Sequence, residues 1–256
     1  MGTAYARLRR AQGRARRSQY RRTARVKRPG EKTEWGVEVS AERPAGPSVR
    51  PRDAATIVLI DRTTGFPRVL VGKRSSRHVF MPDTYVFPGG RRDASDHALP
   101  FASDLHPLVL ARLTGERGTE KSARAIALAA LRELHEETGL TLGDAAGGRL
   151  RASLHTLRYV ARAVTPPGNV RRFDTRFFST FADEAGINPD LIRDTGELHD
   201  LRWLDLRDVD SLSMPRITRT VLEDLKKLMS MDPALPFGSP VPFYYSRRGQ
   251  SFRSTV

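Results

Sequence analysis

The segment at residues 132–140, with the sequence RELHEETGL, constrains this chain more than any other part of it. Its next-to-last residue is Gly139, and glycine readily takes the left-handed conformation that terminates many helices. Thr119 or Ser122 can cap the other end, so the sequence predicts one helix from about residue 120 to Gly139. At about 100° per residue, one face of this helix is expected to lie on a hydrophobic core. That face carries Ala127, Leu131, Leu134 and Thr138.

Three glutamates, Glu133, Glu136 and Glu137, lie on the other side of the predicted helix within an arc of about 100°. Each like-charged pair costs an exposed helix only about 0.2–0.5 kcal/mol, so spacing alone favours a solvated acidic face. Clustered carboxylates are, however, also the ligands that Mg²⁺ and Mn²⁺ prefer. Upstream, the segment TYVFPGG places Gly89 and Gly90 after a short strand, where a bare backbone carbonyl can approach the same ion. The combination favours a metal site.

RELHEETGL resembles the Nudix signature R-E-U-x-E-E-x-G-U, where U is a bulky apolar residue, at every defined position. The segment FPGG resembles the turn that opens this signature. The full family pattern is G-x5-E-x7-R, with 13 residues between glycine and arginine, whereas 41 residues separate Gly90 from Arg132 here. Counted back from Arg132, Arg124 stands where the family has a glutamate. An insertion at this point resembles the Nudix branch that includes peroxisomal-type coenzyme A diphosphatases.

The resemblance implies a fold and a site. The fold is an α/β/α sandwich with a mixed β-sheet, and the cofactor is Mg²⁺ or Mn²⁺. Glu197, on a later loop, is the candidate general base, with one of the signature glutamates as the alternative, and Arg132 is expected to hold the glutamates in place. The implied catalytic residues are Glu136, Glu133, Arg132 and Glu197. The implied metal ligands are the carbonyl of Gly90 and the carboxylates of Glu133, Glu136 and Glu137.

Four further residues are candidates for substrate binding. Arg74 and Arg91 flank the Gly-Gly segment and could hold phosphate groups, although ordinary surface charge explains them equally well. Phe173 and Arg176 belong to the alternating segment RRFDTRFF, which could stack a base and hold a phosphate. A half-buried edge strand accounts for the same alternation.

Nudix enzymes hydrolyse a nucleoside diphosphate linked to another moiety, so the resemblance implies that this chain is a metal-dependent diphosphatase. Coenzyme A or an acyl-CoA is the first substrate candidate. One alternative is hydrolysis of ADP-ribose, a dinucleotide or a nucleotide sugar. Another is a module that binds a nucleotide or RNA without cleaving it, although a complete set of signature glutamates argues against a simple binder.

The chain divides by composition into an arm at residues 1–52 and a Nudix domain at residues 53–256. Residues 1–30 hold eleven Lys and Arg and no Asp or Glu, which is most of the formal net charge of +15. This composition predicts disorder, and it could serve nucleic-acid contact, a transit peptide or a dispensable solvated extension. Within the domain we expect strands at residues 54–60, 68–74, 153–164, 171–181 and 197–206, and a helix at residues 217–229.

Two segments of the domain depart from the regular pattern. An insertion at about residues 91–118 contains one short helical candidate at residues 105–113. Its apolar residues are expected to line a pocket for the non-nucleotide part of the substrate, and the alternative is a surface lobe that packs on itself. These residues are Phe101, Leu105, Leu108, Val109, Leu110 and Leu113. A tail at about residues 232–256, rich in proline and aromatic residues, is expected to pack on the domain in an extended form.

Composition excludes several other classes of protein. The chain has no cysteine, which rules out disulfides, thiolate metal sites and cysteine nucleophiles. No apolar run approaches the 18 residues that a membrane span requires, and the N-terminus lacks the apolar core of a secretory signal. A cytoplasmic protein acting on a small nucleotide substrate, with a homodimer as an open alternative, is the expected result.

Overall fold

The computed structural model describes residues 49–75, 83–115, 118–144, 151–169 and 171–256. The chain divides into two units, Met1–Glu31 and Lys32–Val256, and every described residue belongs to the second. Most of the predicted arm at residues 1–52 therefore lies outside the described residues.

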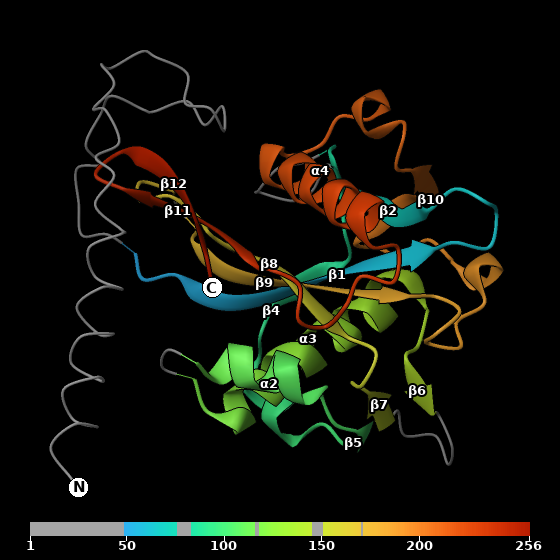
Figure 1. The fold of residues 1–256 in the computed structure, drawn as a ribbon, viewed down its shortest axis with the longest axis horizontal. Coiled ribbons are helices and arrows are strands. Elements are labelled where there is room, and N and C mark those ends of the chain that lie inside the picture. Colours follow the sequence, from blue (N-terminus) through green and yellow to red (C-terminus); the bar gives the residue numbers. More distant parts are fainter. Residues whose placement is uncertain (1–48, 76–82, 116–117, 145–150, 170) are drawn as a thin grey trace, which may run out of the picture. The chain divides into compact units, whose positions relative to one another are not determined.

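Nine strands form one mixed sheet through the middle of the domain (Figure 1). They are β1 (Arg52–Asp61), β2 (Arg68–Arg74), β3 (Tyr85–Val86), β4 (Gly89–Arg91), β8 (Arg158–Val164), β9 (Phe173–Phe181), β10 (Leu198–Asp205), β11 (Pro242–Arg247) and β12 (Gln250–Thr255). The order is β10-β2-β1-β9-β8-β11-β12, while β3 pairs with β2 and β4 pairs with β1. The pairs β1–β9 and β8–β11 are parallel and the others are antiparallel. The predicted mixed sheet is confirmed.

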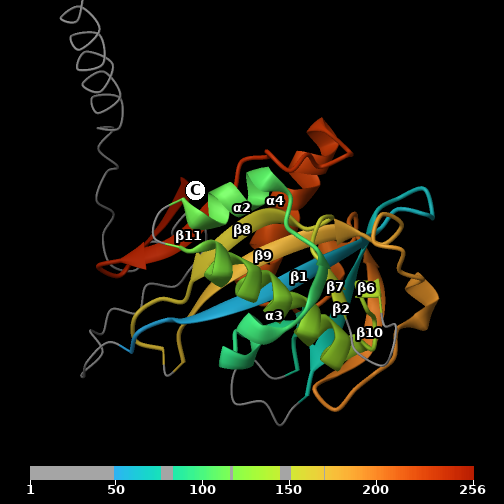
Figure 2. The same ribbon diagram turned by 90° about the horizontal axis from the view of Figure 1, so that it is seen from below.

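Helices cover both faces of this sheet. α3 (Glu120–Thr138) and α2 (Pro107–Thr114) lie on one face, and α4 (Arg216–Met231) lies on the other (Figures 1 and 2). Short 3₁₀ helices occur at η1 (Ala94–Ala98), η3 (Pro189–Leu191) and η4 (Val209–Ser211). A small second sheet consists of β5 (Phe101–Ser103), β6 (Gly143–Asp144) and β7 (Arg151–Ser153), in the order β5-β7-β6. The arrangement is the α/β/α sandwich that the resemblance implied. Among the described helices, none combines the length and hydropathy needed to cross a bilayer.

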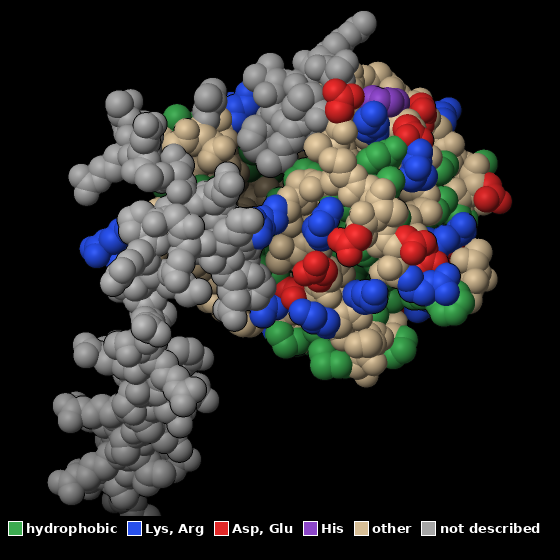
Figure 3. Space-filling view, turned by 90° about the horizontal axis from the view of Figure 1, so that it is seen from above, with side chains coloured by type: hydrophobic (Ala, Val, Ile, Leu, Met, Phe, Trp, Pro, Cys, Tyr) green, Lys and Arg blue, Asp and Glu red, His purple; other side chains and the backbone are tan. Residues whose placement is uncertain are grey.

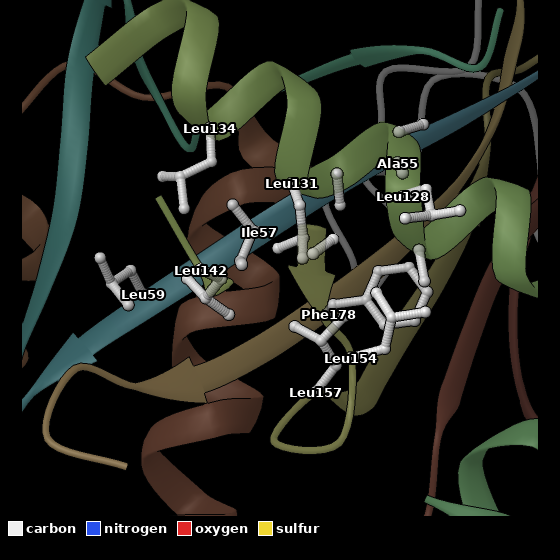
Figure 4. Close-up of a cluster of buried hydrophobic side chains, with 14 of the residues drawn as sticks. Ala55, Ile57, Leu59, Leu128, Leu131, Leu134, Leu142, Leu154, Leu157 and Phe178 are labelled. Carbon is white, nitrogen blue, oxygen red and sulfur yellow. The ribbon is translucent and has the colours of Figure 1, made fainter. Parts of the chain in front are cut away.

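The apolar face of α3 packs on the centre of the sheet (Figure 4). Leu131 and Leu134 are almost completely buried, as are Ile57 of β1 and Phe178 of β9 in the same cluster. Full burial of one such side chain contributes about 1.5–3 kcal/mol, so this contact fixes the orientation of the helix. Since the helix cannot rotate, the glutamates on its other side are held at a fixed edge of the sheet.

Both ends of α3 agree with the prediction. The Thr119 hydroxyl accepts a hydrogen bond from the backbone N–H of Ser122 at 3.1 Å, which makes Thr119 the N-cap. Gly139 has φ of 75° and donates its N–H to the carbonyl of His135. The helix therefore begins and ends where local capping chemistry predicts.

Part of the insertion packs into the hydrophobic core. Leu105 and Val109 are buried in the cluster that α3 covers, and three of the other predicted pocket residues, Phe101, Leu110 and Leu113, pack against that cluster. Of the six residues expected to line a pocket, only Leu108 is largely exposed, at 55%. The pocket prediction was wrong for Leu105 and Val109, which are buried in the core, whereas Phe101, Leu110 and Leu113 are half-buried and their place in a pocket stays a prediction. The predicted helix itself is confirmed as α2.

The tail contains two strands that the sequence did not predict. β11 and β12 form a hairpin at the edge of the main sheet, beside β8. Their side chains reach α4, because the Tyr244 hydroxyl and the Arg253 guanidinium both donate to Asp224, the latter at 2.7 Å. The tail is thus a part of the fold and not an extended segment laid over it.

On the face that carries α4, described Lys and Arg side chains alternate with Asp and Glu side chains (Figure 3). No large patch of a single sign is visible among the described residues of this face.

Candidate active site

Glu137 is buried at the C-terminal end of α3, with 5% exposure. Its Oε2 accepts the backbone N–H of Gly89 at 2.8 Å. Burial raises its pKa to about 8; the Gly89 hydrogen bond and the charge of Arg74 oppose that rise, whereas the charges of Glu133 and Glu197 add to it. A carboxylate kept in such surroundings is costly unless a cation offsets its charge.

Glu133 lies one turn earlier, against the backbone of Gly90. A Cβ on Gly90 would sit 2.3 Å from Oε1 of Glu133, so only glycine allows this approach. Gly89 has φ of 156°, and a Cβ there would lie 2.5 Å from the carbonyl oxygen of Ala55. The Gly-Gly pair therefore lets strand β4 lie directly beside the carboxylates. Burial also raises the pKa of Glu133, although Arg132 opposes the shift.

Glu197 joins these two glutamates from the loop that precedes β10. One carboxylate oxygen from each of Glu133, Glu137 and Glu197 lies within 4.8 Å of the other two. Glu133 and Glu137 are buried, whereas Glu197 is exposed. The fold thus collects three hard oxygen donors from two distant parts of the chain.

Arg132 connects this cluster to the insertion. Its guanidinium donates to the carboxylate of Asp96 at 2.8 and 3.3 Å and to the carbonyl of Arg91 at 3.1 Å. It also lies 2.9 Å from Oε1 of Glu133 and 2.8 Å from Oε2 of Glu136. The predicted role of Arg132 in holding glutamates has a direct geometric basis, because charge-assisted bonds of this length restrain both partners.

Comparisons with known proteins agree with this geometry. A family profile described as NUDIX domain matches residues 118–225. The crystal structure of a NUDIX hydrolase from Alicyclobacillus acidocaldarius is similar, with 28% sequence identity and a TM-score of 0.53, over 68% of this chain and 90% of that one. The chain contains a Nudix domain, and its fold is that of a Nudix hydrolase.

Two other solved structures are similar at lower identity. The NUDIX domain of Shewanella oneidensis NrtR, complexed with ADP ribose, has 14% identity and a TM-score of 0.45, over 70% of this chain and 88% of that one. The Nudix hydrolase RenU from M. smegmatis has 18% identity and a TM-score of 0.44, over 71% and 88%. Comparison with curated proteins gave no match. The profile match begins at residue 118, so the Gly-Gly turn and the insertion precede it.

Asp96 is a site residue of this Nudix hydrolase that the sequence analysis missed. Its side chain is fully buried and accepts both Arg132 and the backbone N–H of Asp93, the latter at 2.7 Å. Counting back from Arg132 led to Arg124, which instead pairs with Asp104 and Glu120. Counting forward from Gly90 leads to Asp96, at the position of the glutamate in G-x5-E. An aspartate therefore stands at this position of the pattern, and the insertion follows it.

Glu136 lies apart from the group of three carboxylates. Its side chain is 53% exposed and pairs with the Arg132 guanidinium, one turn earlier on α3. The structure thus brings Glu133, Glu137 and Glu197 together, with Glu136 on the solvent side of the same helix. A role for Glu136 as a metal ligand stays a prediction.

The four predicted substrate residues lie in different surroundings. Arg74 ends β2, close enough for its charge to act on Glu137. Arg91 pairs with Asp93 at 2.6 Å, and its carbonyl is held by Arg132. Arg176 shares a row across three strands with Ala55 and Gly90, which places it about 10 Å from the turn, and it is ion-paired at 2.7 Å with Asp53. Phe173 lies at the first position of β9, opposite Arg52 of β1.

The residues at the turn and at the end of α3 fit a divalent cation. Three carboxylates and a closely packed glycine backbone supply oxygen donors, which Mg²⁺ and Mn²⁺ prefer to nitrogen or sulfur. Two of the carboxylates are buried, burial raises the pKa of both, and the charge of Glu133 adds to the rise for Glu137, so negative charge is concentrated where water is scarce. A cation placed here would offset that charge.

Proposed function

We propose that this Nudix hydrolase cleaves the diphosphate bond of a nucleoside diphosphate linked to a second moiety, with Mg²⁺ or Mn²⁺ as cofactor. One observation carries the proposal. Two buried glutamates of the signature helix and Glu197 of a separate loop bring carboxylate oxygens within 4.8 Å of one another, beside the Gly89–Gly90 turn. Repulsion between clustered carboxylates destabilises a folded chain unless a positive charge offsets it. In a Nudix domain a divalent cation supplies that charge.

Each residue of the carboxylate cluster has a separate proposed role. Glu133, Glu137 and the Gly90 carbonyl would hold the cation, and Glu136 would complete its surroundings from the solvent side. When bound, the cation offsets the charge of the diphosphate and increases the acidity of the attacking water. Glu197 is exposed and adjoins both buried carboxylates, so it is placed to take a proton from that water as general base. Arg132 keeps Glu133 and Glu136 in position.

Two arginines near the Gly89–Gly90 turn are suited to bind the phosphate groups of the substrate. Arg74 lies at the end of β2 within electrostatic reach of Glu137, and Arg91 follows Gly90 directly. The Arg91 side chain is half exposed and bonded only to the exposed Asp93 among the partners described for it. A phosphate can replace Asp93 at modest cost, because an exposed ion pair contributes about 0–1 kcal/mol.

Coenzyme A or an acyl-CoA is our first substrate candidate. The support is the position of the insertion, which begins directly after Asp96 and adjoins the site through the Asp96–Arg132 ion pair. ADP-ribose, dinucleotides and nucleotide sugars carry the same diphosphate linkage and are the alternatives.

A hydrolysis panel tests the proposal. Purified protein is incubated with Mg²⁺ or Mn²⁺ and CoA, an acyl-CoA, ADP-ribose, NADH or capped RNA, and the products are identified by mass. We expect cleavage between the two phosphates of at least one compound, loss of that activity with a chelator, and loss in Glu133→Gln. Binding without cleavage of any compound would instead favour a nucleotide-binding module.

A further inference from the structure

We infer that Thr195 is a positioning residue, which holds Glu197 in the carboxylate cluster by fastening its loop to the end of α3. The inference rests on the proposed function, which gives Glu197 its role. It concerns a side chain that belongs to neither the signature helix nor the Gly-Gly turn.

The loop that contains Thr195 caps α3 from a distant part of the chain. The last turn of a helix leaves carbonyl groups without partners inside the helix. Here the carbonyl of Glu137 accepts the Thr195 hydroxyl at 3.1 Å, and the carbonyl of Thr138 accepts the N–H of Arg193 at 3.1 Å. The residue whose carboxylate faces the site is thus bonded through its own backbone to the loop that carries Glu197.

Gly139 makes this docking possible. A Cβ on Gly139 would lie 2.3 Å from Nε of Arg193, in addition to the strain expected at its φ of 75°. The final glycine of the signature therefore has two uses in this chain. It ends the helix, and it leaves room for Arg193 to lie over that end.

Hydrogen bonds on both sides hold the short segment from Thr195 to Glu197 in place. The N–H of Thr195 donates to the carbonyl of Leu198 at 2.9 Å, which closes a tight turn around Glu197. The Thr195 hydroxyl also lies 3.4 Å from the N–H groups of Glu197 and Leu198. On the other side, the carbonyl of Glu197 accepts the N–H of Ser75 at 3.3 Å.

Glu197 requires such a restraint because its neighbours repel it. Its carboxylate is exposed and lies beside two buried carboxylates, so without restraint it would turn toward water. Misplacing a catalytic group by about 1 Å can cost on the order of a hundredfold in rate. A hydroxyl that joins the loop to the backbone of Glu137 fixes the distance between the two acids.

The first test compares substitutions of Thr195 on a substrate identified by the hydrolysis panel. Thr195→Ala should lower kcat by about tenfold or more with little change in KM, and Thr195→Ser, which keeps the hydroxyl, should stay within about threefold of the wild type. Ser230→Ala is the matched control, because Ser230 donates its hydroxyl to the Lys227 carbonyl on α4, away from the site. That control should retain wild-type kcat.

A double substitution shows whether Thr195 acts by positioning Glu197 or by stabilising the fold in general. If Thr195 acts through Glu197, Thr195→Ala should cause no further loss in a Glu197→Gln background. An equal loss in both backgrounds, or failure of Thr195→Ser to restore turnover, would overturn the inference.

A crystal structure of Thr195→Ala gives an answer that does not depend on turnover. We expect the Glu197 carboxylate to leave the cluster, beyond 4.8 Å from those of Glu133 and Glu137, while α3 keeps its place. An unmoved Glu197 would refute the positioning role even if the enzyme is active. Absence of wild-type turnover on the whole panel would refute the proposed function instead, and the crystal structure would still decide the role of Thr195.

Discussion

Replacing Glu137 with glutamine should make the metal-free protein more stable at alkaline pH, although it removes a residue of the site. The substitution keeps the size of the side chain and an oxygen that can accept the N–H of Gly89. It removes only the charge. Because Glu137 is 5% exposed, that charge has almost no contact with water.

The size and sign of the effect follow from the pKa of Glu137. Burial raises this pKa from an ordinary 4.5 to about 8, so ionising Glu137 costs the folded, metal-free protein roughly 5 kcal/mol. The corresponding stability is fully present below pH 4.5 and is lost as the pH rises through 8. The free energy of unfolding of the wild type should therefore fall by a few kcal/mol between pH 5 and pH 9. Glu137→Gln should match the wild type at pH 5 and exceed it at pH 9.

Urea denaturation at pH 5, 7 and 9, in the presence of a chelator, measures this difference. Glu223→Gln is the matched control, because Glu223 is exposed on α4 on the opposite face of the sheet, and it should follow the wild type throughout. Mg²⁺ added at pH 9 should stabilise the wild type but not Glu137→Gln. A wild type whose stability does not change with pH, or a Glu137→Gln protein that is less stable than it at pH 9, would refute the reasoning.

Three other changes test separate parts of the structure. Glu136→Gln should lower kcat at least about a hundredfold, near 2.7 kcal/mol in the barrier, and steady-state kinetics that show most activity retained would contradict its predicted place in the metal site. Asp96→Asn should lower the free energy of unfolding by about 2 kcal/mol, because Arg132 loses a charged acceptor, and it should also lower kcat; urea denaturation that shows no change would mean that the ion pair adds nothing. Deleting residues 1–44 should leave turnover nearly unchanged. It should weaken any nonspecific nucleic-acid binding and flatten the salt dependence of that binding. A large loss of turnover would show that the arm is structural.

The sequence predicted α3 well because its signals are local. Periodic apolar residues, a threonine N-cap and a glycine in the left-handed conformation all lie within the helix or next to it. The convergence of Glu197 on this helix is different, since more than fifty residues separate the two in the sequence. No spacing rule predicts that contact, and only the family resemblance pointed to a glutamate on a later loop. No sequence pattern predicts the hydrogen bond between the Thr195 hydroxyl and the Glu137 carbonyl.

The missed hairpin at the C-terminus has a definite physical cause. β11 and β12 are joined by Arg248 and Gly249, both with positive φ, as in the two-residue turns that suit twisted hairpins. Asn-Gly and Asp-Gly are the usual signals for such a turn, and Arg-Gly is not. The prolines before β11 and the non-local pairing with β8 further concealed the strands.

The insertion shows how a signature can be interrupted without loss of its site. Asp96 precedes the insertion and Arg132 follows it, so their ion pair closes a loop with 35 residues between the two partners, where the family pattern has 7. Loop-closure entropy grows only as the logarithm of length, and this fivefold increase costs about 1.4 kcal/mol. Burial of Leu105 and Val109 in the core contributes about 1.5–3 kcal/mol each. Burial of these two side chains therefore offsets the loop-closure cost, and the Asp96–Arg132 ion pair joins the two ends of the added segment beside the site.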